Sequence, residues 1–169
     1  MSTSPAQTPV KPVPDWMNTI TPHLTCRNAM DAIAFYEKAF GAKTLHAMQM
    51  PDGALMHAML QFGDSHIMMN EENEQWGCFS PLSLKGSPVT IHLQVEDVDA
   101  AFARAVDAGC KVTMPLADMF WGDRYGTVED PFGHRWSLAS TIAELTPEEM
   151  QAAAAEAMSG ACCGEMANQ

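Results

Sequence analysis

Basic residues are scarce in this chain of 169 residues. It has 9 lysines and arginines against 21 aspartates and glutamates, which gives a formal net charge of -12 at pH 7. A charge of this sign and size repels phosphate backbones and anionic lipid surfaces. The composition therefore predicts no nucleic acid and no membrane as a partner.

Long apolar runs and paired cysteines are also missing. The first residues, MSTSPAQTPVKPVPDW, are polar and proline-rich and do not form a signal peptide. The five cysteines, an odd number at irregular spacing, do not form a disulfide framework. No P-loop, GxSxG elbow or CxxC occurs, so the sequence lacks these signatures of nucleotide-binding proteins, hydrolases and redox proteins. The sequence thus predicts a cytoplasmic protein with reduced thiols.

What the sequence does contain is one pattern that occurs twice. Alternating apolar residues indicate strands, helical spacing indicates helices, and Asn28 and Asp97 are candidate helix caps. The elements expected in the first copy are a strand at 19–26, a helix at 29–40, and strands at 43–50, 55–62 and 65–70. Those expected in the second copy are a strand at 89–95, a helix at 98–108, and strands at 111–114, 121–129 and 135–139.

The order strand, helix, strands recurs at an offset of 69 residues, at which Thr21/Thr90, His23/His92 and Leu24/Leu93 are identical. A duplication explains this match. The fold class predicted is α+β, with two βαβββ modules whose curved sheets surround a cavity. Because residues of like parity on a strand share a face, His23 and His92 are candidates for equivalent lining of that cavity.

Two segments carry a resemblance to a known family: TPHLTCRNAMDAIAFYEKAFGA and FWGDRYGTVEDPFGHRWSLAS. They resemble the PhnB-like glyoxalase and bleomycin-resistance branch of the vicinal oxygen chelate superfamily, which also includes fosfomycin-resistance enzymes and extradiol dioxygenases. The resemblance covers about residues 19–141. It implies paired βαβββ modules around a small-molecule cavity and a homodimer, but it does not by itself imply a reaction.

The resemblance also implies where a metal would be bound. In metal-dependent members the ligands come from the first and last strands of each module, and the motifs place these positions at Thr21, Met68, Thr90 and Ser137. None of these side chains is a good ligand for a divalent, oxygen-preferring metal. Ser137 stands where a glutamate is expected. The sequence therefore predicts that no cofactor is bound at the usual positions.

A divalent metal stays open as an alternative through another set of residues, His23, His66 and His92. Three imidazoles with an open fourth position are a catalytic arrangement for Zn, Fe or Ni. The other interpretation is that these are cavity or core histidines, because their strands carry no carboxylate partner.

Residues 120–126, FWGDRYG, gather aromatic side chains beside an arginine. Trp121, Arg124 and Tyr125 could stack a planar or anionic ligand at the mouth of the cavity. Alternatively, the aromatic rings pack the hairpin, and Arg124 pairs with Asp123, Glu129 or Asp130. Flexible thioethers in the first sheet would suit an adaptable apolar pocket or simply fill the core; they are Met48, Met50, Met56, Met59, Met68 and Met69.

The tail lies outside the duplicated pattern. Thr146 and Pro147 begin a helix expected to run to about Met158. Cys162 and Cys163 follow it and could hold a soft metal, act in thiol redox chemistry or carry no role. The divisions expected are an arm at 1–17, a domain at 18–142 with modules at 18–72 and 88–142, and a tail at 143–169.

The sequence is therefore compatible with two functions. One is a metal-independent protein that binds a small, largely apolar or aromatic molecule with His23, His92, Trp121, Arg124 and Tyr125. The other is a metal-dependent lyase or dioxygenase-like enzyme that uses the histidine set.

Overall fold

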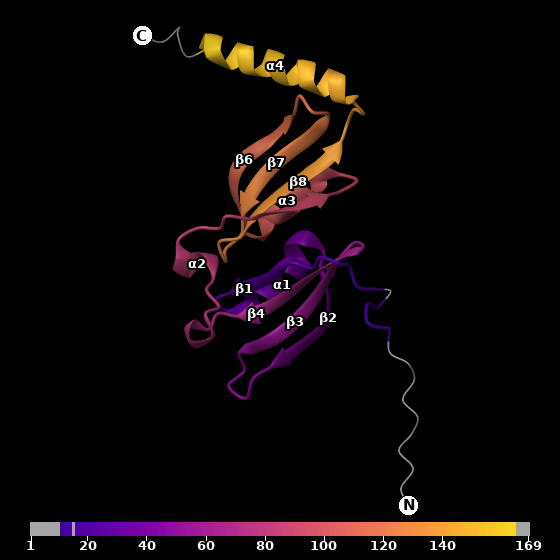
Figure 1. Ribbon diagram of the computed structural model, residues 1–169. Coiled ribbons are helices and arrows are strands. Elements are labelled where there is room, and N and C mark those ends of the chain that lie inside the picture. Colours follow the sequence, from indigo (N-terminus) through magenta and orange to yellow (C-terminus); the bar gives the residue numbers. More distant parts are fainter. Residues whose placement is uncertain (1–10, 15, 165–169) are drawn as a thin grey trace, which may run out of the picture.

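The computed structural model describes residues 11–14 and 16–164, with side chains as far as Ser159. Module 1 consists of β1 (His23–Cys26), α1 (Ala29–Phe40), β2 (Lys43–Gln49), β3 (Leu55–Phe62) and β4 (Ser65–Glu71). A linker holds η1 (Glu74–Trp76) and α2 (Pro81–Leu84). Module 2 consists of β5 (Thr90–Gln94), α3 (Val98–Ala108), β6 (Lys111–Asp118), β7 (Asp123–Glu129) and β8 (Arg135–Thr141). The chain continues into α4 (Pro147–Gly164), which lies beyond the second sheet (Figure 1).

The two sheets have the same topology, which confirms the predicted α+β fold of two βαβββ modules. Their strand orders are β1-β4-β3-β2 and β5-β8-β7-β6. The first strand of each module runs parallel to the last, because a helix returns the chain to the same edge, while the other pairs are antiparallel. His23 lies opposite Met68 and His92 lies opposite Ser137, so the register repeats as well.

The helices bury one stripe each and meet at the junction of the modules. The buried side chains of α1 recur at helical spacing and are Ala29, Ala32, Ile33, Tyr36, Ala39 and Phe40. The helix ends at Gly41, whose left-handed φ of 69° suits a glycine. Trp136 of β8 is fully buried and stacks on Phe40 with ring centroids 4.3 Å apart.

Within one chain the sheets do not close on each other. Helices α1 and α3 pack together, and each sheet turns one face toward its helix (Figure 1). Alternation then leaves the opposite face of each sheet without a covering layer from the described elements. We call these surfaces the open face of module 1 and the open face of module 2.

The start of module 1 differs from the sequence prediction in two ways. Strand β1 begins at His23 rather than at residue 19, since Pro22 has no backbone N–H to donate to a ladder. Asn28 occupies the N-cap position of α1, but its side chain makes no capping hydrogen bond. Instead the Glu71 carboxylate accepts hydrogen bonds from the backbone N–H groups of Asn28 at 2.7 Å and Ala29 at 2.8 Å.

The later helix signals hold. The Asp97 side chain accepts from Ala100 N at 2.9 Å, and Thr146 and Glu149 form a reciprocal cap at the start of α4. Most described side chains of α4 are exposed, and those of Cys162 and Cys163 lie outside the described residues. No helix of the described part is long and apolar enough to cross a membrane.

Candidate functional site

The open face of module 2 carries a chain of hydrogen bonds centred on His92. Its Nδ1 lies 2.8 Å from the Ser137 hydroxyl, and its Nε2 lies 3.0 Å from the side-chain oxygen of Gln94. Gln94 donates to Thr141 at 2.9 Å, and the Thr141 hydroxyl donates to Asp123 at 2.9 Å. Because both ring nitrogens are engaged, the imidazole is held in one orientation.

Aromatic rings lie beside this network. The ring of Tyr125 is nearly parallel to that of His92, with centroids 6.3 Å apart, and Trp121 meets Tyr125 edge-on at 5.5 Å. Phe120, which is 40 % exposed, packs edge-on against Trp121 at 4.9 Å. The structure thus brings together three of the predicted site residues, His92, Trp121 and Tyr125, on one part of the surface.

Arg124 does not join them. It is the neighbour of Tyr125 on β7, so alternation sends it to the other face of the sheet. There its guanidinium makes two hydrogen bonds of 2.8 Å to Asp99 of α3 and one of 3.0 Å to Asp118 of β6. The arginine does pair with carboxylates, but not with Asp123, Glu129 or Asp130, which the sequence had offered. Its ion pairs lower the pKa of the Asp99 carboxyl.

Three histidines cluster on the open face of module 1, namely His23, His46 and His57, and of these the sequence had predicted a role only for His23. Nε2 of His46 on β2 lies 3.3 Å from Nδ1 of His57 on β3. The ring of His23 meets His57 edge-on, with centroids 5.5 Å apart. Burial, then the charges of His23 and His46, lower the pKa of His57. The missed signal was the same alternation, since His57 shares a strand face with Met59.

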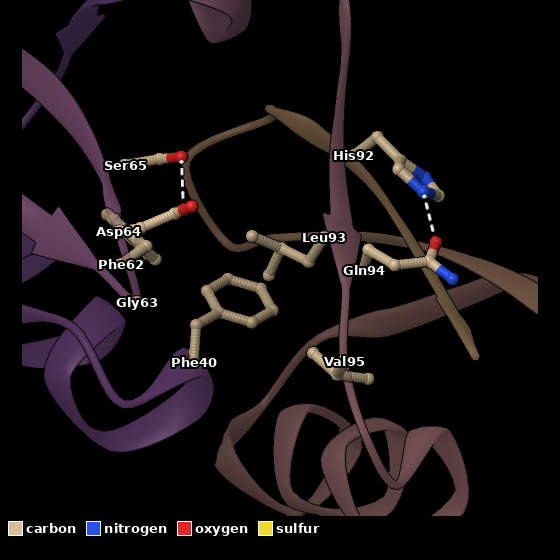
Figure 2. Close-up of a pocket in the computed structure, with 9 residues that line it drawn as sticks. All are labelled: Phe40, Phe62, Gly63, Asp64, Ser65, His92, Leu93, Gln94 and Val95. Atoms are coloured by element: carbon tan, nitrogen blue, oxygen red, sulfur yellow. Dashed lines mark hydrogen bonds between the residues drawn. The ribbon is translucent and has the colours of Figure 1, made fainter. Parts of the chain in front are cut away.

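Cavities line the boundary between the two modules. One of about 350 Å³ lies between the β3–β4 turn and β5 (Figure 2). Phe40 and Leu93 point toward each other across it, whereas His92 and Gln94 lie on the far side of β5 (Figure 2). A second hollow, of about 340 Å³, lies between β1 and the linker and includes His23. In one chain, therefore, His23 and His92 border different hollows.

His66 is buried at 7 % exposure beneath the ring of Trp16, whose centroid is 5.9 Å away. Its Nδ1 makes no hydrogen bond. It lines a cavity of about 270 Å³ together with His92, and His23 is not part of that lining. Among the described residues, no three His, Cys, Asp or Glu side chains gather so as to hold a metal ion. The alternative set of His23, His66 and His92 is therefore not assembled within one chain.

A buried carboxylate holds the two modules together. Asp130, 4 % exposed, accepts from the Tyr36 hydroxyl at 2.8 Å and from the Trp136 indole N–H at 2.9 Å. Its other oxygen accepts from the backbone N–H groups of Phe132 and His134, both at 2.9 Å. Burial raises the pKa of Tyr36, which keeps its hydroxyl a donor. The DPFGHRW segment thus serves as a structural junction.

Cys26 lies in the same junction, 3.5 Å from Nε2 of His134. That nitrogen also lies 3.2 Å from the carbonyl oxygen of Thr25, which can only accept, so Nε2 carries the proton. Burial raises the pKa of the Cys26 thiol to about 12 and lowers that of His134. A neutral thiol beside a donating imidazole is not an activated nucleophile.

Comparisons with known proteins fit this architecture. The family model of the Glyoxalase/Bleomycin resistance protein/Dioxygenase superfamily matches residues 16–138. The chain belongs to this superfamily. An uncharacterized protein of Mycobacterium tuberculosis is 48% identical over 137 residues, covering 79% of this chain and 81% of the relative. The resemblance predicted from the two motifs is therefore confirmed.

Solved structures share the fold. TioX from Micromonospora sp. ML1 has 26% identity and a TM-score of 0.59, covering 74% of this chain and 99% of its own. The fosfomycin resistance protein FosX from Listeria monocytogenes, solved with Mn(II) and sulfate, has 17% identity and a TM-score of 0.57, covering 79% and 94%. A PhnB protein from Bacillus cereus shares the fold as well, with 19% identity and a TM-score of 0.58, covering 73% of this chain and 100% of its own.

Proposed function

We propose that the protein binds a small, largely apolar or aromatic molecule on its open faces, as a homodimer and without the usual divalent metal. Module 1 of one copy would face module 2 of the other, so that each cavity is lined by residues of both. His23, His92, Trp121 and Tyr125 are the proposed contacts. Arg124 is left out of this set, because its guanidinium is engaged with Asp99 and Asp118 on the other face.

The observation that carries this proposal is the environment of Ser137. This residue occupies the place where the resemblance expects a metal-binding carboxylate, and it is 3 % exposed. Its hydroxyl is directed to Nδ1 of His92 rather than left available. A neutral hydroxyl offers neither the charge nor the basicity that a divalent ion or a general base would need. Binding without turnover follows.

The lining favours a flat or apolar ligand. Tyr125 and Trp121 supply aromatic surface, and Thr113 and Thr127 share a hydrogen bond of 2.7 Å on the same sheet. Exposed Met48 and half-buried Met68 extend the opposite wall with flexible thioethers, which adapt to varied shapes. Such a surface left open to water is a common mark of an interaction site.

The dimer can be tested independently of the ligand. Sedimentation of the full chain should give twice the monomer mass of 18.4 kDa. A monomer at all concentrations up to about 100 μM would contradict the proposed pairing of faces.

Binding is tested by calorimetry and thermal shift. The probes are a dicarbonyl–glutathione adduct, a bleomycin-type glycopeptide and a panel of planar aromatic metabolites. At least one probe should raise the midpoint by mass action and remain chemically unchanged. Tyr125→Ala should weaken its binding about tenfold, or about 1.4 kcal/mol, with Arg124→Ala as the matched control. No shift with any probe, turnover of the bound probe, or one Zn, Mn, Ni or Fe per chain would contradict the proposal.

One observation favours the second candidate, a metal-dependent lyase or dioxygenase. His66 Nδ1 is buried without a hydrogen-bond partner, and His66 lines a cavity with His92. An ion there would satisfy this nitrogen, and His23 would have to come from the second copy. This alternative predicts one divalent ion per chain in protein purified without a histidine tag, and its loss in His66→Ala.

A further inference from the structure

Three histidines on the open face of module 1 are each paired with a methionine, whereas a fourth, His66, is paired with Gln61. In the strand register, the residues directly opposite one another are His23 and Met68, His46 and Met59, and His57 and Met48. Side chains paired in this way share a face, and in the antiparallel pairs of β2 with β3 their Cβ atoms are about 4.5–5.5 Å apart. This face therefore presents imidazole nitrogens and thioether sulfurs side by side.

Four of these residues form a square on strands β2 and β3. His46 and Met48 lie two positions apart on β2, and His57 and Met59 lie two positions apart on β3. The histidines occupy one diagonal and the methionines occupy the other. Met59 is only 2 % exposed, so its side chain is covered by its neighbours on this face, and it does not belong to the main hydrophobic core.

The histidine diagonal has the spacing of two ligands of one ion. With metal–nitrogen bonds of about 2.0 Å, two imidazole nitrogens around a tetrahedral ion stand about 3.3 Å apart. Nε2 of His46 and Nδ1 of His57 are 3.3 Å apart, now sharing a hydrogen. If both rings are neutral, a change of tautomer moves this hydrogen to a distal ring nitrogen, and both facing lone pairs become free without net release of a proton.

The donor set selects the kind of ion. Thioether sulfur favours soft Cu(I), and imidazole accepts copper as well. All four donors are neutral, so the ion keeps its whole charge, and a monovalent ion carries a smaller desolvation cost than a divalent one. Zinc would want a third His, Cys, Asp or Glu, and no such trio gathers among the described residues.

We propose that the open face of module 1 binds one Cu(I) ion, held by His46 and His57 with the thioethers of Met48 and Met59 as further ligands. His23, whose ring rests edge-on against His57, supports the orientation of that imidazole. The site is separate from the four positions of the usual metal and does not depend on the proposed organic ligand. Module 2 has no counterpart in its described residues, because β6 and β7, which correspond to β2 and β3, contain no histidine.

The test is an anaerobic titration of the full chain with Cu(I) in competition with bicinchoninate. The background variant carries Cys78→Ser, Cys162→Ser and Cys163→Ser, because thiols also bind Cu(I). We expect one Cu(I) per chain. Loss of a ligand should cost at least about tenfold in affinity, since even outer partners cost 10–100-fold. His46→Ala and His57→Ala should each show this loss, and the matched control His92→Ala should not.

X-ray absorption of the Cu(I) complex of selenomethionine-labelled protein gives a second readout. Copper–selenium scattering identifies methionine ligands and cannot come from cysteine. His46 is exposed on an edge strand, so its replacement tests the site even if His57→Ala does not fold. Unchanged affinity in His46→Ala, or a copper shell without selenium, would overturn the proposal.

Discussion

In module 2, His92 is hydrogen-bonded to Ser137 and to Gln94, whereas its counterpart in module 1, His23, lies edge-on against the ring of His57. The backbone positions of the two histidines are equivalent. Each lies on the first strand of its module, and in both modules this strand pairs in parallel with the last strand. What differs is the row of side chains across the sheet. One copy of the duplicated fold has become a hydroxyl and amide network, and the other a histidine and methionine cluster.

The comparison extends to the helix starts. The offset of 69 that relates the modules also relates Glu71 to Ser140 and Ala29 to Val98. Glu71 accepts from Ala29 N at 2.8 Å, and Ser140 accepts from Val98 N at 3.0 Å. The last strand therefore caps the helix in both modules, with a carboxylate in one and a hydroxyl in the other. The hydrogen bond from the start of the helix to the last strand is thus present in both modules, although a different residue type accepts it in each.

The largest effect is expected where the modules join. Asp130→Ala removes the acceptor of the buried Tyr36 hydroxyl and the Trp136 indole N–H, leaving both donors without a partner. Each orphaned donor costs about 1–3 kcal/mol, so the free energy of unfolding should fall by about 3 kcal/mol or more. Urea unfolding followed by tryptophan fluorescence measures it. Asp118→Ala, at an exposed carboxylate, is the control, and equal losses in the two variants would refute the junction role.

The next effect compares the two helix caps. Glu71→Ala leaves two backbone N–H groups at the start of α1 without their acceptor and removes a negative charge from the positive end of the helix. We expect a loss of about 1–2 kcal/mol in the free energy of unfolding. Ser140→Ala, the matched change in module 2, should cost about 1 kcal/mol or less, because Asp97 also caps α3. A larger loss in Ser140→Ala would reverse the comparison.

The segment that follows β4 gives a pH-dependent effect through Glu72. Hydrogen bonds from Ser80, then from Ser83 and Arg27, lower the pKa of Glu72 to about 2. Its ionised form is favoured in the folded chain, so its contribution is complete above the ordinary glutamate pKa of about 4.3 and is lost as the pH falls through about 2.

Glu72→Gln should therefore destabilise the protein by about 1 kcal/mol at pH 7 and progressively less toward pH 2.5. Urea midpoints of the variant and the wild type at both pH values check this. Glu74→Gln, an exposed neighbour in the same linker, should show no such trend. A difference that stays constant with pH would show that Glu72 does not act through its charge.

The smallest effect is expected at Arg124. Its carboxylate partners Asp99 and Asp118 are exposed, and ion pairs in water contribute little. Arg124→Ala should leave the urea midpoint near that of the wild type, with any difference fading at 1 M salt, and should not alter probe binding. A loss of probe binding comparable with that of Tyr125→Ala would return Arg124 to the ligand site.

Much of the fold followed from local patterns. Alternation and helical spacing predicted both modules, and residue types predicted the caps at Asp97 and Thr146. Asn28 has the residue type of a side-chain cap, but the Glu71 carboxylate, 43 positions away, accepts the hydrogen bonds instead. The residue type at the start of a helix does not predict such a distant partner. The candidate site divided in the same way. Counting along β7 places Tyr125 on one face and Arg124 on the other, which the grouping of FWGDRYG as one cluster overlooked. Only the tertiary structure shows that Arg124 pairs with Asp99, which lies 25 positions away.

The sequence by itself determined the duplication, the family and the absence of carboxylates at the usual metal positions, since these depend only on which residue stands where. The tertiary structure alone decided that His46 and His57 touch, that Asp130 joins the modules and that the two sheets of one chain do not close on each other. The physical reason is that strand register and helix packing depend on the sum of many weak contacts between distant segments. No short stretch of residues encodes that sum.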